Sequence, residues 1–318
     1  MIDFRYHLVS IVAIFLALAL GIILGSTTLS QSVADSLRSQ ATAAKERGDR
    51  LRAENTTLTQ QIRGEEQFAQ VLGPQIVTER LRGQSVVFVE TPGAASEALE
   101  QVSELAQQAG ATVTGRVTIQ KKFLNDDQEQ TVDILAGQLK PEGVTFASDA
   151  SAYDKAGAVL ASAIVTKDTA KAGREDASGG AVLGGFKQAG YVTTSGKPGQ
   201  HATLAVVMAP STPYTASGGD TDNKALLSVT TALDAAAGGT VLGGPNTAAQ
   251  KGGLISALRG SDVDKNVSSV DMADKSSGQV VVILSLQDEL AGKAGQYGIG
   301  PDASGYLPSP APAAGKAG

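Results

Sequence analysis

The sequence is poor in side chains that bind soft transition metals. Thiolate, thioether and imidazole groups are the ligands that such metals prefer, yet the 318 residues include no Cys, two His and three Met. Beyond the first seven residues, the candidates are His201, Met208 and Met272. They lie far apart in the sequence, and Met208 ends an apolar run, where a methionine most simply packs into a core. A metal site on this chain would need folding to bring the three together.

No arrangement of residues predicts catalysis. A Ser/His/Asp hydrolase would need His201 as its base, but Ser211 lacks the G-x-S-x-G turn of such enzymes. The acidic pairs are Asp126–Asp127, Asp220/Asp222 and Asp262/Asp264. The first two fall where helices are expected to begin, which favours carboxylates without any chemistry, and the third lies in a polar loop without the spacing of a calcium loop. We therefore expect a non-enzymatic protein without catalytic residues or a bound cofactor.

Composition excludes further classes of protein. The net charge of −6 argues against nucleic-acid binding, because proteins of that class carry a basic surface. The absence of Cys excludes a disulfide scaffold and an iron–sulfur cluster. An apolar fraction of 42% is enough for a hydrophobic core. The chain is therefore expected to fold, and nucleic acid is not expected among its partners.

Residues 8–25 form an uncharged, almost wholly apolar run. At 1.5 Å per residue this run is roughly 27 Å long, close to the thickness of the hydrocarbon core of a bilayer. The alternative is a cleaved signal peptide, but the residues that follow make a poor cleavage site. We predict a transmembrane anchor over residues 1–28. Arg5 precedes the run and the next basic residue is Arg38, so the positive-inside rule places the N-terminus in the cytoplasm and the rest outside the plasma membrane.

One face of the predicted anchor carries small residues at every fourth position. These are Ala13, Ala17, Gly21 and Gly25. Small residues at this spacing allow two membrane helices to pack closely, although Ala and Gly are also common in such helices for other reasons. The stripe is therefore a first indication that two copies of the chain associate.

A heptad pattern over residues 29–73 gives a second, independent indication of self-association. The apolar seam and its one Asn comprise Leu37, Ala44, Leu51, Asn55, Leu58 and Ile62. A single Asn at a seam position sets a parallel dimer in register, whereas Gly48 and Glu65 weaken the pattern. The alternative is a helix packed along its own globular domain. We predict a coiled coil in a parallel homodimer, ended by Gly73 and Pro74.

Residues 83–300 predict a doubly wound, mostly parallel α/β domain, because short apolar runs alternate with amphipathic helices. The expected strands are 85–90, 111–119, 203–208, 240–242 and 280–286, of which the last is the strongest. The expected helices are 96–109, 127–139, 153–165, 179–189, 223–236 and 247–258. Residues 301–318 are rich in Pro, Ala and Gly and predict a disordered tail.

In an open parallel sheet, ligands bind beyond the carboxyl ends of the strands. Those ends carry Glu90-Thr91, Pro210-Ser211 and the stretch 243–246. The last of these opens an expected helix and could hold an anion on its free N–H groups. However, neither G-x-G-x-x-G nor G-x-x-x-x-G-K-[ST] occurs in the chain, and Gly-Gly-Pro is more often a plain turn. No small-molecule site is predicted.

The first residues resemble a known family. The stretch from Ile2 to His7 reads IDFRYH and runs into the apolar anchor, as in the actinobacterial copper transporter family of the MctB type. The order of anchor, coiled helix and α/β domain is similar over nearly the whole chain. The resemblance implies an envelope protein with a role in copper efflux or tolerance. Because this chain offers so few copper ligands, we expect that role to depend on other envelope proteins.

The same family resembles the membrane partner of an actinobacterial cell-separation pair, whose exported coiled coil is thought to activate a peptidoglycan hydrolase. A membrane-tethered coiled coil with a ligand-poor α/β head would suit such a regulator or scaffold. This is the second hypothesis for function, and it differs from the first in the phenotype that a deletion strain should show.

Overall fold

The computed structural model describes residues 4–214 and 218–309. The chain divides into two compact units, one formed by the residues up to Glu65 and one by the residues from Glu66 on. The described part of the first unit is helical throughout and belongs to helix α1 (Phe4–Val77), whose last turns are part of the second unit. The second unit therefore begins inside a helix, earlier than the predicted domain start at residue 83.

Helix α1 does not end at Gly73 and Pro74 as predicted, but continues to Val77. Pro74 costs little here because it lies in the last turn, close to where the helix stops in any case. Thr78 then donates its hydroxyl to the carbonyl of Pro74 at 2.7 Å. A Cβ atom on Gly73 would come within 2.8 Å of Val280 Cγ2, so this glycine permits close packing rather than a helix end.

A seven-stranded sheet forms the centre of the second unit, in the order β3-β2-β1-β4-β5-β6-β7. The strands are β1 (Ser85–Glu90), β2 (Thr112–Ile119), β3 (Val192–Gly196), β4 (Leu204–Met208), β5 (Thr240–Gly243), β6 (Ser268–Val270) and β7 (Gln296–Tyr297). All neighbouring pairs are parallel except β2 and β3. β1 and β4 are neighbours at the centre. β2 and β3 follow beyond β1 toward one edge of the sheet, and β5, β6 and β7 follow beyond β4 toward the other. This confirms the prediction of a mixed α/β domain with a mostly parallel sheet.

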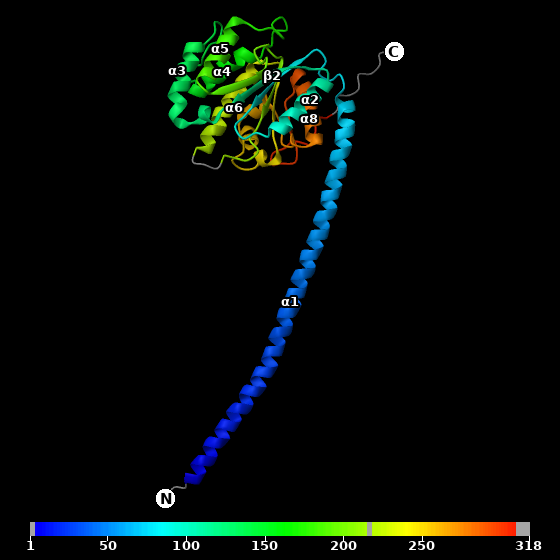
Figure 1. The fold of residues 1–318 in the computed structure, drawn as a ribbon, viewed down its shortest axis with the longest axis vertical. Coiled ribbons are helices and arrows are strands. Elements are labelled where there is room, and N and C mark those ends of the chain that lie inside the picture. The colour runs from blue at the N-terminus through cyan, green and yellow to red at the C-terminus, as the bar shows by residue number, and fades with distance from the viewer. Residues whose placement is uncertain (1–3, 215–217, 310–318) are drawn as a thin grey trace. The chain divides into compact units, whose positions relative to one another are not determined.

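Helices cover both faces of this sheet (Figure 1). One face packs against α3 (Glu129–Leu139), α4 (Ala152–Ile164), α5 (Ala177–Gln188), α6 (Gly219–Ala236) and α7 (Leu254–Arg259). The other face packs against the end of α1, α2 (Ser96–Gln108) and α8 (Ser276–Leu290). Four short 3₁₀ helices complete the described fold: η1 (Lys121–Leu124), η2 (Asp126–Gln128), η3 (Asn246–Ala249) and η4 (Asp262–Lys265).

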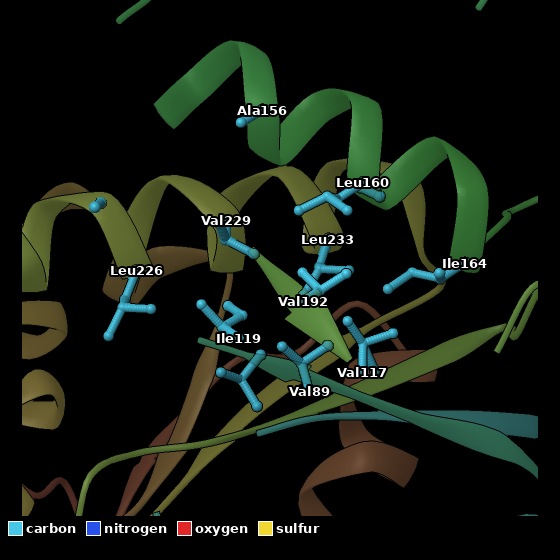
Figure 2. Close-up of a cluster of buried hydrophobic side chains, with 14 of the residues drawn as sticks. Val89, Val117, Ile119, Ala156, Leu160, Ile164, Val192, Leu226, Val229 and Leu233 are labelled. Carbon is cyan, nitrogen blue, oxygen red and sulfur yellow. The ribbon is translucent and has the colours of Figure 1, made fainter. Parts of the chain in front are cut away.

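The apolar runs of the central strands supply the core on both sides. In β1, Val87 and Val89 enter the core below α4 and α6, whereas Val86 and Phe88 enter the core below α2 and α8. Figure 2 shows the first of these cores, with side chains from β1, β2 and β3 facing those from α4 and α6. Strands buried on both faces need continuous apolar runs, which is why the sequence identified β1 and β4 correctly.

The strand predicted at 280–286 is wrong, because these residues lie in the middle of α8. A short apolar run cannot be told from a buried helix by its periodicity. Four consecutive residues, Val280 to Ile283, are buried, since α8 packs against the sheet, α2 and the end of α1. The predicted helix over 247–258 is also only partly correct. It is divided into η3 and α7 by residues 250–253.

The end of the described chain is hydrogen-bonded to β7, although most of its residues are exposed. Ser304 donates its N–H to the carbonyl of Gln296 at 2.7 Å, and Gly305 forms a bridge with Tyr297 in β7. The predicted disordered tail therefore does not begin at residue 301. Its remainder, residues 310–318, lies outside the described residues.

Candidate functional site

The two methionines considered as metal ligands lie in the same apolar core. Met208 ends β4 and Met272 follows β6, and both pack in the cluster formed with α2 and α8. Their exposed fractions are 1% and 4%. Met208 Sδ lies 3.4 Å from the position that a Cβ on Gly243 would take, so its thioether fills the space beside that glycine. Both side chains serve packing, as the sequence indicated for Met208.

His201 lies elsewhere, before the start of β4. Its Nδ1 is 2.8 Å from the carbonyl oxygen of Arg174, and its Nε2 is 3.1 Å from that of Ser162 in α4. The length of β4, roughly 13 Å at 3.3 Å per residue, separates it from Met208. A histidine ligand must present a nitrogen lone pair to the metal. Here both nitrogens face main-chain oxygens, so the fold does not assemble the three predicted ligands into one site.

Among the described residues, acidic side chains do not form a metal site in place of the two methionines and His201. Within residues 4–214 and 218–309, no group of three or more His, Asp or Glu side chains is placed to hold a metal ion. Asp126 begins η2, and Asp220 and Asp222 lie in the first turn of α6, as the sequence predicted for helix starts. Burial raises the pKa of Asp222, and the charge of Asp126 raises it further.

The third acidic pair, Asp262 and Asp264, lies in η4 rather than in a plain loop. Asp262 is exposed and paired with Lys265 at 2.5 Å, and this hydrogen bond lowers the pKa of its carboxyl. An exposed pair of this kind is an ordinary surface interaction. These carboxylates therefore give no support to a cation site.

The switch point of the sheet lies between β1 and β4, where an α/β fold of this type would hold a ligand. Here the two loops that follow the strands are hydrogen-bonded to each other. Thr91 donates its hydroxyl to the carbonyl of Met208 at 2.6 Å, and Ser211 donates its N–H to Gly93 at 2.9 Å. Tyr214 adds a hydrogen bond from its hydroxyl to the carbonyl of Pro92 at 2.7 Å. These hydrogen bonds tie the loop after β1 to the loop after β4.

Glu90, at the carboxyl end of β1, is bound within the same layer. Its two carboxylate oxygens accept hydroxyl hydrogen bonds from Ser96 at 2.5 Å and Thr118 at 2.9 Å, and Arg116 approaches to 3.6 Å. These partners join α2 and β2 to the end of β1. Glu90 therefore holds neighbouring elements together.

The stretch 243–246, which the sequence favoured as a plain turn over an anion position, is hydrogen-bonded through the main chain of Gly244. Gly244 donates its N–H to Val270 at 2.9 Å and accepts from Ala273 at 2.9 Å. The helix that follows, η3, has only four residues. The turn joins β5 to β6 and η3, which agrees with the plain-turn interpretation of Gly-Gly-Pro.

One buried charged cluster was missed by the sequence analysis. Arg259 at the end of α7 pairs with Asp271 at 2.8 Å, and both side chains are almost fully buried. Arg259 also donates to the carbonyls of Tyr297 and Pro301, each at 2.8 Å, while Asp271 accepts the N–H of Gly300 at 3.0 Å. With these partners the pair is neutralised and hydrogen-bonded, so its role is to fasten residues 296–301 to the sheet. No motif in the sequence marks it.

In the first unit, the residues of the predicted anchor and of the predicted seam are exposed. Phe4–Gly25 is the one stretch of the described chain long and apolar enough to cross a membrane. A Cβ on Gly21 or Gly25 would meet nothing within 4 Å, so this part of the small-residue stripe is open. Ala13, Ala17 and Arg5 are also exposed. The large seam side chains are 54% to 65% exposed: Leu37, Leu51, Leu58 and Ile62. The two smaller seam residues, Ala44 and Asn55, are exposed as well.

Comparison with known proteins identifies the family. A family model described as "Copper transport outer membrane protein, MctB" matches residues 1–308. Proteins named copper transporter MctB from Mycobacterium tuberculosis and Mycobacterium bovis are each 29% identical to this chain over 305 residues, which cover 94% of this chain and 97% of theirs. The protein of that name from Mycobacterium leprae is 29% identical over 312 residues. With a match that extends over nearly its whole length, this chain belongs to the MctB family of copper transport proteins.

Proposed function

We propose that this chain acts in copper transport as a membrane-tethered, dimeric component that depends on partner proteins. The observation that carries this proposal is the position of its three soft ligands. Met208 and Met272 are buried in an apolar core, and both nitrogens of His201 face carbonyl oxygens. A chain that does not offer these groups to a metal would act on copper through another envelope protein.

The proposed location is the plasma membrane, with a single span and the α/β unit outside the cytoplasm. A helix of 22 residues is roughly 33 Å long, enough for the hydrocarbon core of a bilayer. Arg5 at the N-terminal end of the span and the absence of Lys and Arg after it until Arg38 support a cytoplasmic N-terminus. The family description refers to an outer membrane. Fractionation of cell envelopes, with protease added from outside, would test both the membrane and the orientation.

The proposed dimer is parallel and uses the seam of α1. Its large apolar side chains lie more than half exposed on a single copy, and burial of such a stripe favours association. Asn55 supports a parallel pair in register, since two Asn side chains can then face each other across the seam. The open face of Gly21 and Gly25 would allow the anchors to pack in the same arrangement.

An anaerobic copper(I) competition titration on the detergent-solubilised full chain tests the absence of an intrinsic site. We expect no tight stoichiometric binding by the wild type. Met208→Leu and Met272→Leu keep the core volume, and His201→Gln keeps a hydrogen-bonding side chain. All three variants should restore copper tolerance to a deletion strain. Tight binding by the wild type that these variants abolish would refute partner dependence and establish a direct site.

Regulation of cell separation is the second candidate, favoured by the long exposed seam. The two candidates predict different phenotypes for a deletion strain: copper sensitivity for the first and chained, unseparated cells for the second. Replacing Asn55 and Glu65 by Leu gives a further distinction. Copper tolerance should survive this change under the first candidate, whereas activation of a hydrolase partner should change under the second.

A further inference from the structure

A cavity of about 200 Å³ lies where three helices of the second unit meet. The last turns of α1, the second half of α2 and the start of α8 form its walls. Gly73 lets α1 and α8 approach each other closely, because a Cβ at this position would come within 2.8 Å of Val280 Cγ2. Sites for drug-sized molecules begin at about 300 Å³, so this cavity suits a smaller ligand.

Amide side chains dominate the polar lining of this cavity, and each of the three helices contributes at least one. They are Gln70 from α1, Gln101 and Gln108 from α2, and Gln279 from α8. Glu104 lies between the two glutamines of α2, and the spacing of three and four residues puts all three side chains on one face of that helix. The fold therefore gathers four amides from distant parts of the chain around one small space.

Gln279 is the buried member of this set. Its side chain lies on α8, the residue is 7% exposed, and its Nε2 donates to Oε1 of Gln101 at 2.6 Å. This hydrogen bond sets the direction in which the amide of Gln279 faces. Among the described residues, its Oε1 has no hydrogen-bond partner, although the polar atoms of a buried side chain normally have one. The cavity is thus lined by an oriented acceptor that the protein itself does not use.

The charges around the cavity argue against an anionic ligand. None of the described residues that line it is Lys or Arg, and the charged group among them is the carboxylate of Glu104. The N-terminus of α8 would attract an anion, but there the carboxylate of Glu66 already accepts the N–H of Ser276 at 2.8 Å. A ligand for this space must therefore bind through neutral donors and acceptors.

We propose that this cavity binds a neutral polyhydroxyl ligand of the size of one sugar ring. A sugar hydroxyl both donates and accepts hydrogen bonds, and an amide offers two N–H groups and a carbonyl oxygen, so the two kinds of group match in both directions. The C–H groups of the ring pack against the apolar part of the lining, Pro74, Leu105 and Val280. This site goes beyond the proposed role in copper transport and does not depend on it.

Saturation-transfer NMR on the full chain, solubilised in a detergent without a sugar head group, tests the site. The neutral probes are glucose, mannose, galactose, arabinose and N-acetylglucosamine, and glucosamine and glucuronate supply a cationic and an anionic ring. We expect saturable transfer to at least one neutral sugar and weaker transfer to glucuronate, because Glu104 repels a second carboxylate. The proposal is overturned if no neutral sugar binds, or if glucosamine alone binds, since that would indicate a site for cations.

Substitutions in the lining separate this cavity from other surfaces. Gln70→Ala and Gln108→Ala each remove an amide at an exposed position and should weaken sugar binding about two- to tenfold, the effect of one hydrogen bond. Gln279→Leu removes the buried amide and should weaken it by about tenfold. Gln107→Ala is the matched control, because Gln107 is exposed beside Gln108 but does not line the cavity. Equal affinities in Gln107→Ala and Gln108→Ala would overturn the assignment. If Gln279→Leu fails to fold, the two exposed variants decide.

Discussion

Replacing Glu289 by Gln should stabilise the α/β unit at alkaline pH. Glu289 is buried on α8, where its carboxylate accepts hydrogen bonds from the N–H of Ser268 at 2.8 Å and from the hydroxyl of the same residue. Burial raises its pKa from the usual 4.5 to about 7, the hydrogen bonds from Ser268 oppose this, and the charges of Asp234 and Asp288 add to it. The native state therefore holds this proton more tightly than the unfolded chain does.

The direction in which the free energy of unfolding changes with pH follows from the protons bound by the native and the unfolded state. Below pH 4.5 the group is protonated in both states, so its full contribution to stability is present. As the pH rises toward 7, the unfolded chain ionises first, and the free energy of unfolding falls until the native carboxyl ionises too. One pH unit corresponds to about 1.4 kcal/mol, so the total loss is about 3 kcal/mol. Glutamine stays neutral and keeps an oxygen for Ser268, so the variant should avoid this loss.

Urea unfolding, followed by tyrosine fluorescence from pH 5 to 8, measures the effect, since the chain has no Trp and two of its described Tyr, Tyr153 and Tyr191, are buried. The variant should exceed the wild type by about 3 kcal/mol at pH 8 and approach it at pH 5. Glu142→Gln, at an exposed position, is the matched control and should follow the wild type throughout. A variant less stable than the wild type at pH 8 would refute the reasoning, because it would mean that the charged form is favoured by the native state.

Three further predictions concern packing, pairing and association. Arg259→Met should destabilise the α/β unit by about 3–5 kcal/mol in urea, because Asp271 would be left buried without its partner. Gly73→Ala should destabilise the α/β unit by about 1–3 kcal/mol, because the added methyl group would overlap the side chain of Val280. Gly48→Ala lies where the space is open and should instead stabilise helix α1 by about 1 kcal/mol. Asn55→Leu should shift the full chain from dimers toward mixed or larger oligomers in sedimentation experiments.

Each of these has an outcome that contradicts it. Lys265→Met removes one partner of an exposed ion pair and should leave the stability almost unchanged. An effect equal to that of Arg259→Met would mean that burial is not the reason. Gly73→Ala and Gly48→Ala should differ in sign, so an equal effect would argue against close packing at Gly73. A monomeric wild type would remove the basis for the Asn55 prediction.

The sequence was most informative where one pattern excluded the others. The central strands β1 and β4 are continuous apolar runs bounded by turn residues, and in α2 the buried positions Leu99, Val102 and Leu105 follow the helical period. Such patterns depend on one or two faces of an element being apolar, which is a local property. They were enough to predict a mostly parallel α/β domain after an apolar helix.

The errors arose where burial is set by distant parts of the chain. β6 contains Ser268 and Ser269, which are fully buried because Glu289, Arg259 and Gln296 satisfy their hydroxyls. No apolar run marks such a strand. α8 shows the converse, since its apolar run results from contact on several sides. Both errors come from tertiary contacts that a window of neighbouring residues does not contain.

The candidate ligands show the same limit. Sequence alone indicated a core role for Met208, but it could not show that Met272 joins the same cluster or that His201 faces two carbonyls. The switch point could be anticipated from the βαβ pattern, whereas the hydrogen bonds of Thr91, Ser211 and Tyr214 beside it join two loops about 120 residues apart. Chemistry at a site is thus less predictable than the fold that surrounds it.

The boundary at Glu66 has a practical meaning for anyone who cuts or recombines this chain. Glu66 accepts the N–H of Ser276 at 2.8 Å at the start of α8, and Val77 and Leu81 belong to the core. A truncated chain that starts after Pro74 would lose this hydrogen bond between Glu66 and the first turn of α8. One that starts a turn before Glu66 would keep it. The helix before Glu66 contributes no residue to the core, so a change in its length would leave the packing of the second unit intact.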